Sequence, residues 1–292
     1  MSFEDVMIAV NRWMITTEAL AAVGAELTLA DSDEPGHPDV VRALRAVSAA
    51  AGLPELDQLA PPQRELVGGL IRMCLRQAQD LIEDPARAPG WTFTDPDILA
   101  GWGRGSAIVP GALAAAIPEL AGIGSFLDVG SGVGLLAIAA ARTWPAATIT
   151  GIDVWEPALR IAAENVKAAG LADRITLRHG DVTGLDESEV YDCVWFPTFF
   201  VTEARLDAAM PRLVRSLRRG GWLVLGLMAP HPDPVAGAVS TLRTIRGGGA
   251  HFSSQRLMSA LEAARCVGIR TLPRSGPAPM EYVIGRRQGS AD

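Results

Sequence analysis

The chain has 292 residues, of which 49% are hydrophobic and 20% are charged, so a large buried core is expected and a disordered chain is excluded. Its net charge of -7 argues against a nucleic-acid partner, because phosphate binding needs a concentrated basic face. The three cysteines, Cys74, Cys193 and Cys266, lack C-x-x-C spacing, which excludes a disulfide framework and a zinc site of the usual kind. No basic stretch precedes an apolar run at the start, and the longest uninterrupted apolar runs, such as 135–141, are short for a membrane span. We therefore expect a soluble cytoplasmic protein with no membrane partner.

The first hundred residues show a helical pattern. Apolar residues recur at helical spacing over 3–30, and further helices are expected at about 39–51 and 62–83. A connector rich in Pro, Gly and Trp follows at 84–105, where Asp95 and Pro96 are typical of a helix start. Another helix is expected at about 107–117. We interpret 1–105 as a helical region on the acceptor side, whose apolar first helix serves either its own core or a homodimer contact.

From residue 125 the pattern alternates between strand and helix. Strands are expected at 125–129, 148–153, 174–179, 191–196 and 221–227, with helices at about 133–143, 156–169 and 202–218. A helix at about 254–265 then precedes two strands, at 267–272 and 281–285, that are joined by a Pro/Gly loop without a helix. This order predicts an α/β fold over 106–292, a doubly wound, mostly parallel sheet with an antiparallel pair at its end.

A glycine-rich turn follows the first strand, in Asp128-Val-Gly130-Ser131-Gly132-Val-Gly134. Such a turn lets a ligand approach the backbone, and the following helix offers N–H groups at its start. The dinucleotide fingerprint is G-x-G-x-x-G, whereas the spacing here is G-x-G-x-G, which favours a ligand other than NAD.

Acidic residues end the next two strands. The second strand ends at Asp153, where a carboxylate can accept both hydroxyls of an adenosine ribose; the alternative is that Asp153 caps the following helix. After the third strand, Asp181 can accept from an adenine amino group while Val182 packs on the ring. Phe196, at the end of the fourth strand, can cover the adenine or line an acceptor pocket.

The motifs Leu127-Asp-Val-Gly-Ser-Gly-Val-Gly134, Gly151-Ile-Asp153, Gly180-Asp181, Asp192-Cys-Val-Trp195 and Arg219-Gly-Gly-Trp222 occur in this order. Over residues 120–287 the chain resembles the class I S-adenosylmethionine (SAM)-dependent methyltransferases. The resemblance implies a Rossmann-like, seven-stranded sheet with an antiparallel last strand, and SAM as cofactor. It also implies roles for the residues of these motifs. The backbone of Gly130, Ser131, Gly132 and Gly134 would hold the methionine moiety, with Asp128 near its ammonium. Asp153 would hold the ribose, and Asp181 with Val182 the adenine. Val154 and Phe196 are also expected among the cofactor-binding residues.

The turn after the fourth strand departs from one branch of this family. Many relatives that methylate amino groups of proteins or nucleic acids carry Asn or Asp followed by Pro-Pro-aromatic, whereas this chain has Trp195-Phe-Pro-Thr-Phe-Phe200. The missing polar residue, together with the acidic charge, favours a small, apolar or aromatic acceptor. The residues expected to line its pocket are Trp102, Arg104, Trp195, Thr198 and Phe199. Trp91 and Phe93 lie in the same connector as Trp102, where aromatic rings serve either the pocket or the packing of the helical region.

An oxygen acceptor needs a general base near neutral pH. The candidates are His231 and His251, because both follow the fifth strand, in loops at the ligand-facing end of the sheet. No metal site is expected. Two alternatives to methyl transfer stay open at this point, a protein that binds SAM or adenosine without transferring a methyl group, and an NAD-dependent oxidoreductase.

Overall fold

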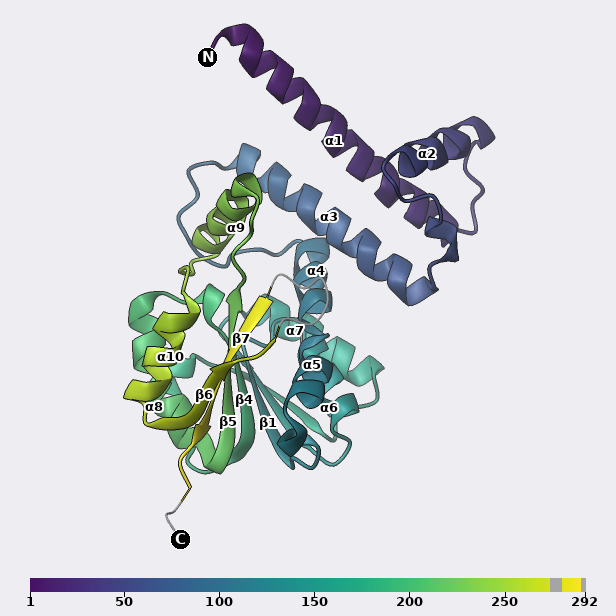
Figure 1. Cartoon of the computed structure of the whole chain (residues 1–292). Helices are drawn as coiled ribbons and strands as arrows, with labels where there is room; N and C mark the ends of the chain where they lie inside the picture. The colour runs from purple at the N-terminus through teal and green to yellow at the C-terminus, as the bar shows by residue number, and fades with distance from the viewer. Residues whose placement is uncertain (274–279, 290–292) are drawn as a thin grey trace. The chain divides into compact units, whose positions relative to one another are not determined.

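A computed structural model describes residues 1–273 and 280–289. Two compact units divide the chain (Figure 1). The helical unit comprises residues 1–85 and 95–104, and the sheet unit comprises 86–94 and the residues from 105 onward. The expected boundary after residue 105 lies one residue from the division after Arg104. Residues 86–94, inside the expected connector, group with the sheet unit, which the sequence pattern does not indicate.

The helical unit contains α1 (Phe3–Ala30), α2 (Pro38–Ala50), the 3-10 turn η1 (Leu56–Gln58), α3 (Pro61–Glu83) and most of α4 (Pro96–Ser106). Its core joins the end of α1 to η1 and α3 through Val23, Leu27, Leu56 and Ile71. The expected start of α4 is confirmed, because Asp95 Oδ1 accepts from the backbone N–H groups of Asp97 and Ile98, at 2.9 and 3.2 Å.

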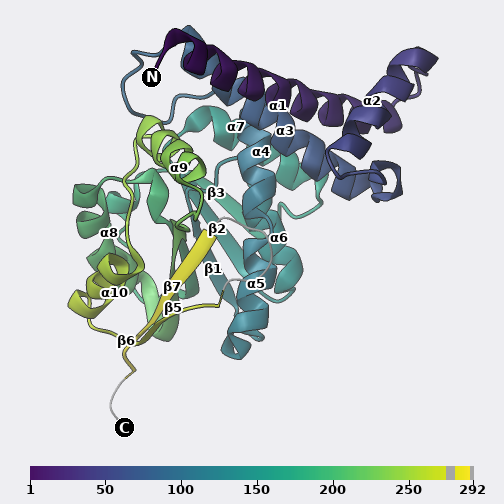
Figure 2. The ribbon, with the colours of Figure 1, turned by 45° about the horizontal axis from the view of Figure 1, so that its top comes forward.

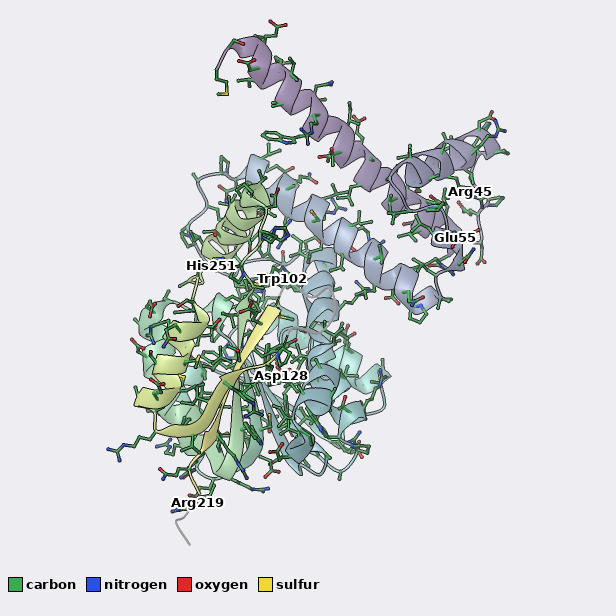
Figure 3. All side chains as sticks on the ribbon, in the orientation of Figure 1. Arg45, Glu55, Trp102, Asp128, Arg219 and His251 are labelled. Carbon is green, nitrogen blue, oxygen red and sulfur yellow. The ribbon has the colours of Figure 1, made fainter. Side chains whose placement is uncertain are left out.

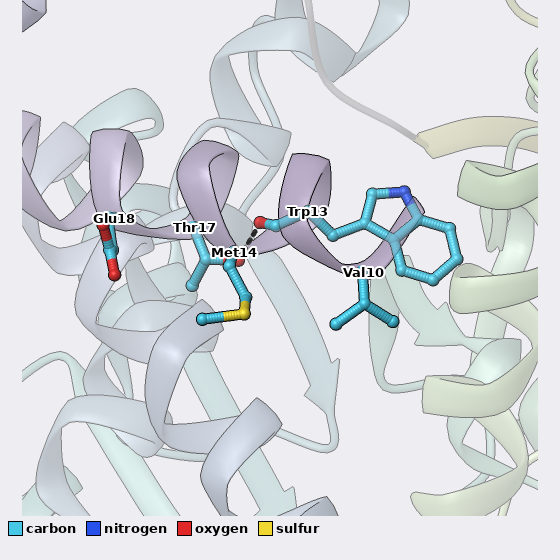
Figure 4. Close-up of a pocket in the computed structure, with 5 residues that line it drawn as sticks. All are labelled: Val10, Trp13, Met14, Thr17 and Glu18. Carbon is cyan, nitrogen blue, oxygen red and sulfur yellow. Dashed lines mark hydrogen bonds between the residues drawn. The ribbon is translucent and has the colours of Figure 1, made fainter. Parts of the chain in front are cut away.

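The first half of α1 carries exposed apolar side chains, and Figure 4 shows Val10, Trp13 and Met14 around a hollow on this helix. By length and composition α1 is long and apolar enough to cross a membrane, a property that counting uninterrupted apolar runs missed. Core helices of soluble proteins and signal sequences share that property. The homodimer contact expected of this helix stays a prediction.

In the described part of the chain, the sheet has seven strands in the order β3-β2-β1-β4-β5-β7-β6. The first five in sequence are parallel neighbours, whereas β7 runs antiparallel to both β5 and β6. The expected α/β fold with an antiparallel end is thus confirmed. The strands are β1 (Ser125–Val129), β2 (Thr148–Asp153), β3 (Ile175–His179), β4 (Tyr191–Pro197), β5 (Leu217–Met228), β6 (Cys266–Thr271) and β7 (Met280–Arg287). The Pro/Gly loop expected between the last two lies largely at 274–279, outside the described residues.

Helices cover both faces of this sheet (Figures 1 and 2). One face packs on α8 (Glu203–Ser216) and α10 (Ser254–Ala263), with a core that includes Leu127, Val194 and Leu225. The other carries α6 (Leu135–Thr143) and α7 (Glu156–Ala168), and α5 (Val109–Ala116) packs on α6. Because side chains alternate along a strand, Asp128 and Trp195 point to this second face, where the two residues are paired neighbours on β1 and β4.

One helix of the sheet unit was missed, α9 (Pro234–Arg246), which lies between His231 and His251. Its start carries a recognisable signal, since Asp233 accepts from the Ala236 N–H at 2.8 Å and Pro234 takes the first helical position. Strand β5 also begins earlier than expected, at Leu217. The segment expected to be a glycine turn is part of the strand, and Gly220 within it has a φ of 78°.

Asp192 joins three strands at the end of the sheet remote from the glycine turn. Its Oδ2 accepts from the backbone N–H groups of Gly124 and Ser125, at 2.8 and 2.9 Å, and Arg218 Nη1 lies 3.0 Å from Oδ1. Partial burial raises the pKa of Asp192, but the Gly124 N–H, the Ser125 hydroxyl and the Arg218 guanidinium outweigh it and leave the pKa below its ordinary value. The ionised carboxylate therefore stabilises the fold.

Asp192→Asn is expected to lower the free energy of unfolding at pH 7 by about 1–3 kcal/mol, as for the loss of hydrogen bonds to a charged group. Since the folded-state pKa is depressed, this stabilisation is present above the unfolded pKa of about 3.9 and disappears as pH falls through the folded value. Urea denaturation at pH 7 and pH 3.5 measures the difference, with Asp186→Asn, at an exposed position, as control. An equal deficit at both pH values would contradict this electrostatic account.

Candidate functional site

The glycine turn after β1 is held against the end of β2. Gly130, Gly132 and Gly134 have φ values of 71°, 53° and 78°, a region that residues with a side chain rarely adopt. The backbone N–H groups of Gly130 and Ser131 both donate to the Ile152 carbonyl, at 2.8 and 3.1 Å. Gly134 then starts α6, and a Cβ there would lie 3.1 Å from the Ala162 Cβ on α7. Hydrogen bonds therefore hold the turn against β2, and its three glycines leave the backbone uncovered.

Asp153 connects this turn to the residues that follow β2. Its Oδ2 accepts from the Gly132 N–H and its Oδ1 from the Trp155 N–H, both at 2.7 Å. Trp155 is the N-cap residue of α7, so Asp153 fixes the turn before the helix and is not itself the cap. Burial raises the pKa of Asp153, and the backbone N–H groups of Trp155, Gly132 and Val154 offset part of that rise. Each carboxylate oxygen keeps a second lone pair that can accept from a ligand hydroxyl.

Two polar side chains at the turn are buried without a hydrogen-bond partner among the described residues. They are the carboxylate of Asp128, 1% exposed and labelled in Figure 3, and the hydroxyl of Ser131, 6% exposed. Burial and the charge of Asp153 raise the pKa of Asp128 well above its ordinary value, and the approach of the Ala137 backbone N–H offsets this only in part. Buried polar groups are normally paired, so these atoms fit a ligand that brings hydrogen-bond partners.

The expected adenine residues lie further along the same edge. Asp181 is half-buried, and its carboxylate already accepts from the Thr183 N–H at 2.9 Å and pairs with Arg205 Nη1 at 3.0 Å. Burial raises its pKa, but the Thr183 groups and Arg205 outweigh that effect, and the pKa lies below its ordinary value. Val154 is exposed beside Asp153, whereas Val182 and Phe196 lie in the core on the α8 side of the sheet.

Of the residues expected to line the acceptor pocket, the structure groups those in and just after β4. Trp195 lies against Gly226, where a Cβ would come within 2.2 Å of the indole, and its ring meets Tyr282 edge-on at 5.9 Å. The buried Thr198 hydroxyl donates to the Gly226 carbonyl at 2.7 Å. Phe199 packs on Phe200 with ring centroids 4.6 Å apart.

Other expected site residues are not in this group. Trp102 and Arg104 lie in the helical unit, where Arg104 pairs with Glu65 of α3 at 2.8 Å. His231 and His251 are exposed in the loops before and after α9, and His231 Nδ1 accepts from the Asp233 N–H at 3.1 Å. The sequence analysis missed Trp155, whose indole N–H donates to the Phe93 carbonyl at 2.8 Å. Its only signal was its position two residues after Asp153.

Comparisons with known proteins agree with this geometry. Residues 126–221 match the family model described as a methyltransferase domain. The release factor glutamine methyltransferase of Rhodopirellula baltica is 33% identical over 101 residues, which cover 34% of each chain. A U6 snRNA (guanine-N2)-methyltransferase of Bos taurus is 30% identical over 159 residues, 51% of this chain and 32% of that one. The chain thus spans about a third of the curated relatives that it matches.

Structural similarity extends further along the chain. Human N-acetylserotonin methyltransferase, solved in complex with SAM, has a TM-score of 0.70 at 13% identity and covers 98% of both chains. At that identity the likeness concerns the fold. The fold, the glycine turn with its two acidic partners, and the family match agree in identifying residues 126–221 as a methyltransferase domain of the class I SAM-dependent type. SAM is the cofactor of such domains.

The donor set of the site suits SAM. The buried Asp128 carboxylate can receive the ammonium of the methionine moiety, and Asp153 has the free lone pairs that two ribose hydroxyls need. The glycines of the turn leave its backbone open to close approach. The residues present therefore fit the cofactor, and the individual contacts assigned to them stay predictions.

Asp128→Asn is expected to stabilise the ligand-free protein while weakening SAM binding. Because the folded-state pKa of Asp128 is raised, its ionisation costs stability as pH rises above the unfolded value of about 3.9, until the folded pKa is passed. The variant removes this cost, so its Tm should exceed that of the parent protein more at pH 8 than at pH 5. Each kcal/mol corresponds to about 2–4 °C for a domain of this size.

Differential scanning fluorimetry with and without SAM measures both effects, with the exposed Asp173→Asn as control. A lower Tm than the parent at pH 8, or an undiminished shift on adding SAM, would show that Asp128 is a structural residue and not a ligand for the ammonium.

Proposed function

We propose that this chain transfers the methyl group of SAM to a small, apolar or aromatic acceptor. The observation that carries the proposal is the turn after β4, where Pro197-Thr198-Phe199-Phe200 supplies aromatic rings in place of a polar side chain. The hydroxyl of Thr198 is committed to the Gly226 carbonyl. Trp91 lies edge-on to Phe200, with ring centroids 5.1 Å apart, and extends the aromatic surface.

Methyl transfer from a sulfonium is a direct displacement, for which SAM supplies the electrophilic methyl group. The chain has to align the acceptor with that group and to exclude water. In this proposal, Asp153, Asp128 and the glycine turn fix the donor, while the rings of Trp91, Phe199 and Phe200 orient an apolar acceptor and keep the site dry. Most of the rate enhancement then comes from holding SAM and the acceptor in the correct relative orientation, and not from a strong acid or base.

A general base is needed only if the acceptor is a hydroxyl or an ammonium group. His251 is the better of the two candidates, because the Nδ1 atom of His231 already accepts from the Asp233 N–H, which leaves that nitrogen unavailable to a substrate proton. Both side chains are exposed, so the proposal assigns His251 a role only for an acceptor that reaches the loop after α9.

The curated relatives favour a different acceptor, since the release factor methyltransferase acts on a glutamine of a protein and the U6 snRNA enzyme on a guanine. Both groups are planar and polar. The residues after β4 offer them no amide or carboxylate partner, and unpaired polar groups in an apolar site weaken binding strongly. N-acetylserotonin methyltransferase, whose fold matches over the whole chain, is named for a small aromatic acceptor. These points support the small-molecule proposal.

The test is an acceptor screen with SAM labelled in its methyl group. The panel contains phenols, hydroxyquinones and indoles on one side, and a release-factor peptide and a structured RNA on the other. We expect transfer to at least one aromatic small molecule and none to peptide or RNA, and we expect Phe200→Ala to raise the KM for the acceptor more than the KM for SAM.

Transfer confined to the peptide or RNA would replace the proposed acceptor class. Tight SAM binding with no transfer to a broad panel would favour the alternative of a SAM-binding protein without methyltransferase activity, since binding and chemistry use different residues.

A further inference from the structure

Residues 86–94 form a short strap on the sheet unit. Along the chain they follow Pro85 and precede Asp95, both of which belong to the helical unit. The strap itself packs on the sheet unit beside the end of α9, where the Gly90 N–H donates to the Arg246 carbonyl at 3.0 Å (Figure 1). Gly248, with a φ of 83°, lets the two backbones meet, since a Cβ there would lie 3.0 Å from the Gly90 Cα.

The strap reaches the carboxyl ends of two strands. At one point the Phe93 carbonyl accepts the indole N–H of Trp155, which follows β2. At another, the ring of Trp91 meets that of Phe200, which follows β4, at 5.1 Å and an interplanar angle of 73°. The carboxyl ends of parallel strands are where ligands bind in such sheets, so the strap connects the donor side of the site with the acceptor side.

Trp155 touches both the strap and the residue that we expect to bind the ribose. Its backbone N–H donates to Asp153 Oδ1 at 2.7 Å, and its indole N–H donates to the Phe93 carbonyl at 2.8 Å. Trp155 therefore connects the Asp153 carboxylate to the strap through two hydrogen bonds. Arg87 stiffens the strap around that bond, because Nη1 donates to the Gly90 carbonyl at 3.1 Å while the guanidinium lies 4.6 Å from the centre of the Phe93 ring.

We propose that Trp155 is a positioning residue that couples occupation of the cofactor site to the position of the strap, and through the strap to the acceptor side. A ligand bound to Asp153 stabilises the two bonds that Trp155 makes, to Asp153 and to the Phe93 carbonyl, and with them the contact of Trp91 with Phe200. The strap so held slows release of the cofactor product and presents the aromatic surface to the acceptor. This inference rests on the proposed function for its consequence in catalysis, but the coupling itself requires only cofactor binding.

The chemistry requires a tryptophan at this position. A phenylalanine or tyrosine fills much of the same space, but neither carries a donor where the indole nitrogen lies. Trp155→Phe thus removes one hydrogen bond and leaves the backbone N–H on Asp153 in place. A net hydrogen-bond contribution near its usual size corresponds to about a fivefold change in an equilibrium or rate constant.

The experiment compares the parent protein with Trp155→Phe and with Trp222→Phe. Trp222 lies toward the amino end of β5 and is paired with Cys193 of β4, so the control makes the same chemical change away from the site. One readout is hydrogen–deuterium exchange of a peptide covering the strap, with and without S-adenosylhomocysteine. The other is the dissociation rate of S-adenosylhomocysteine in a stopped-flow displacement experiment. Neither needs an acceptor.

In the parent protein and Trp222→Phe, we expect S-adenosylhomocysteine to slow exchange in the strap. In Trp155→Phe that protection should be lost, and dissociation should be about fivefold faster. If the strap of Trp155→Phe exchanges faster but is still protected by the ligand as in the parent protein, the residue has only a structural role and the coupling is refuted. Trp155→Tyr, which also lacks the indole donor, serves if the phenylalanine variant does not fold.

The outcomes for the two proposals differ. Absence of S-adenosylhomocysteine binding to the parent protein would overturn the cofactor assignment, and the coupling with it. Binding without any ligand effect on the strap would overturn the coupling alone. Ligand-dependent protection that requires Trp155, in a protein that methylates none of the small acceptors, would support the coupling and contradict the proposed acceptor.

Discussion

The backbone bonds between the glycine turn and the end of β2 are the constraint on which the site depends. The Ile152 carbonyl accepts from two consecutive N–H groups of the turn, and the Asp153 carboxylate accepts from a third. The glycines of the turn have positive φ values, and the bond from the Gly132 N–H holds the Asp153 carboxylate beside the turn. The same carboxylate then orders Trp155 and so reaches the strap. The expected donor site is thus built from local backbone geometry.

The proposed acceptor side is built differently. The aromatic rings assigned to it come from the strap, from the turn after β4 and from β7, segments that are far apart in sequence and meet only in the folded chain. Loops of this kind change without disturbing the sheet, which explains how one fold serves acceptors as different as a glutamine side chain, a guanine and N-acetylserotonin. The role predicted for Asp128 requires the opposite: its buried carboxylate has no hydrogen-bond partner among the described residues, and keeping it there lowers stability.

How far the sequence predicts this structure depends on the range of the interactions. The strands, the antiparallel end and the start of α4 follow from alternation, chain order and capping residues, which act over a few positions. Helix α9 was not predicted, because its apolar residues do not form a buried stripe: Val235, Val239 and Ile245 are exposed. The bond from Trp155 to Phe93 joins residues 62 positions apart and has no periodic signal. Trp102 and Arg104 were grouped with the connector by proximity in sequence, yet they belong to the helical unit, whereas Trp91 and Phe93 belong to the sheet.

Isothermal titration calorimetry tests the cofactor assignment most directly, with S-adenosylhomocysteine and NAD as titrants and with Asp153→Ala as the variant. The account predicts that S-adenosylhomocysteine binds at a single site per chain, that the variant weakens this binding at least about tenfold through the loss of hydrogen bonds to a charged group, and that NAD gives no binding heat. Binding of NAD in place of S-adenosylhomocysteine, or S-adenosylhomocysteine affinity unchanged in a folded Asp153→Ala protein, would contradict it.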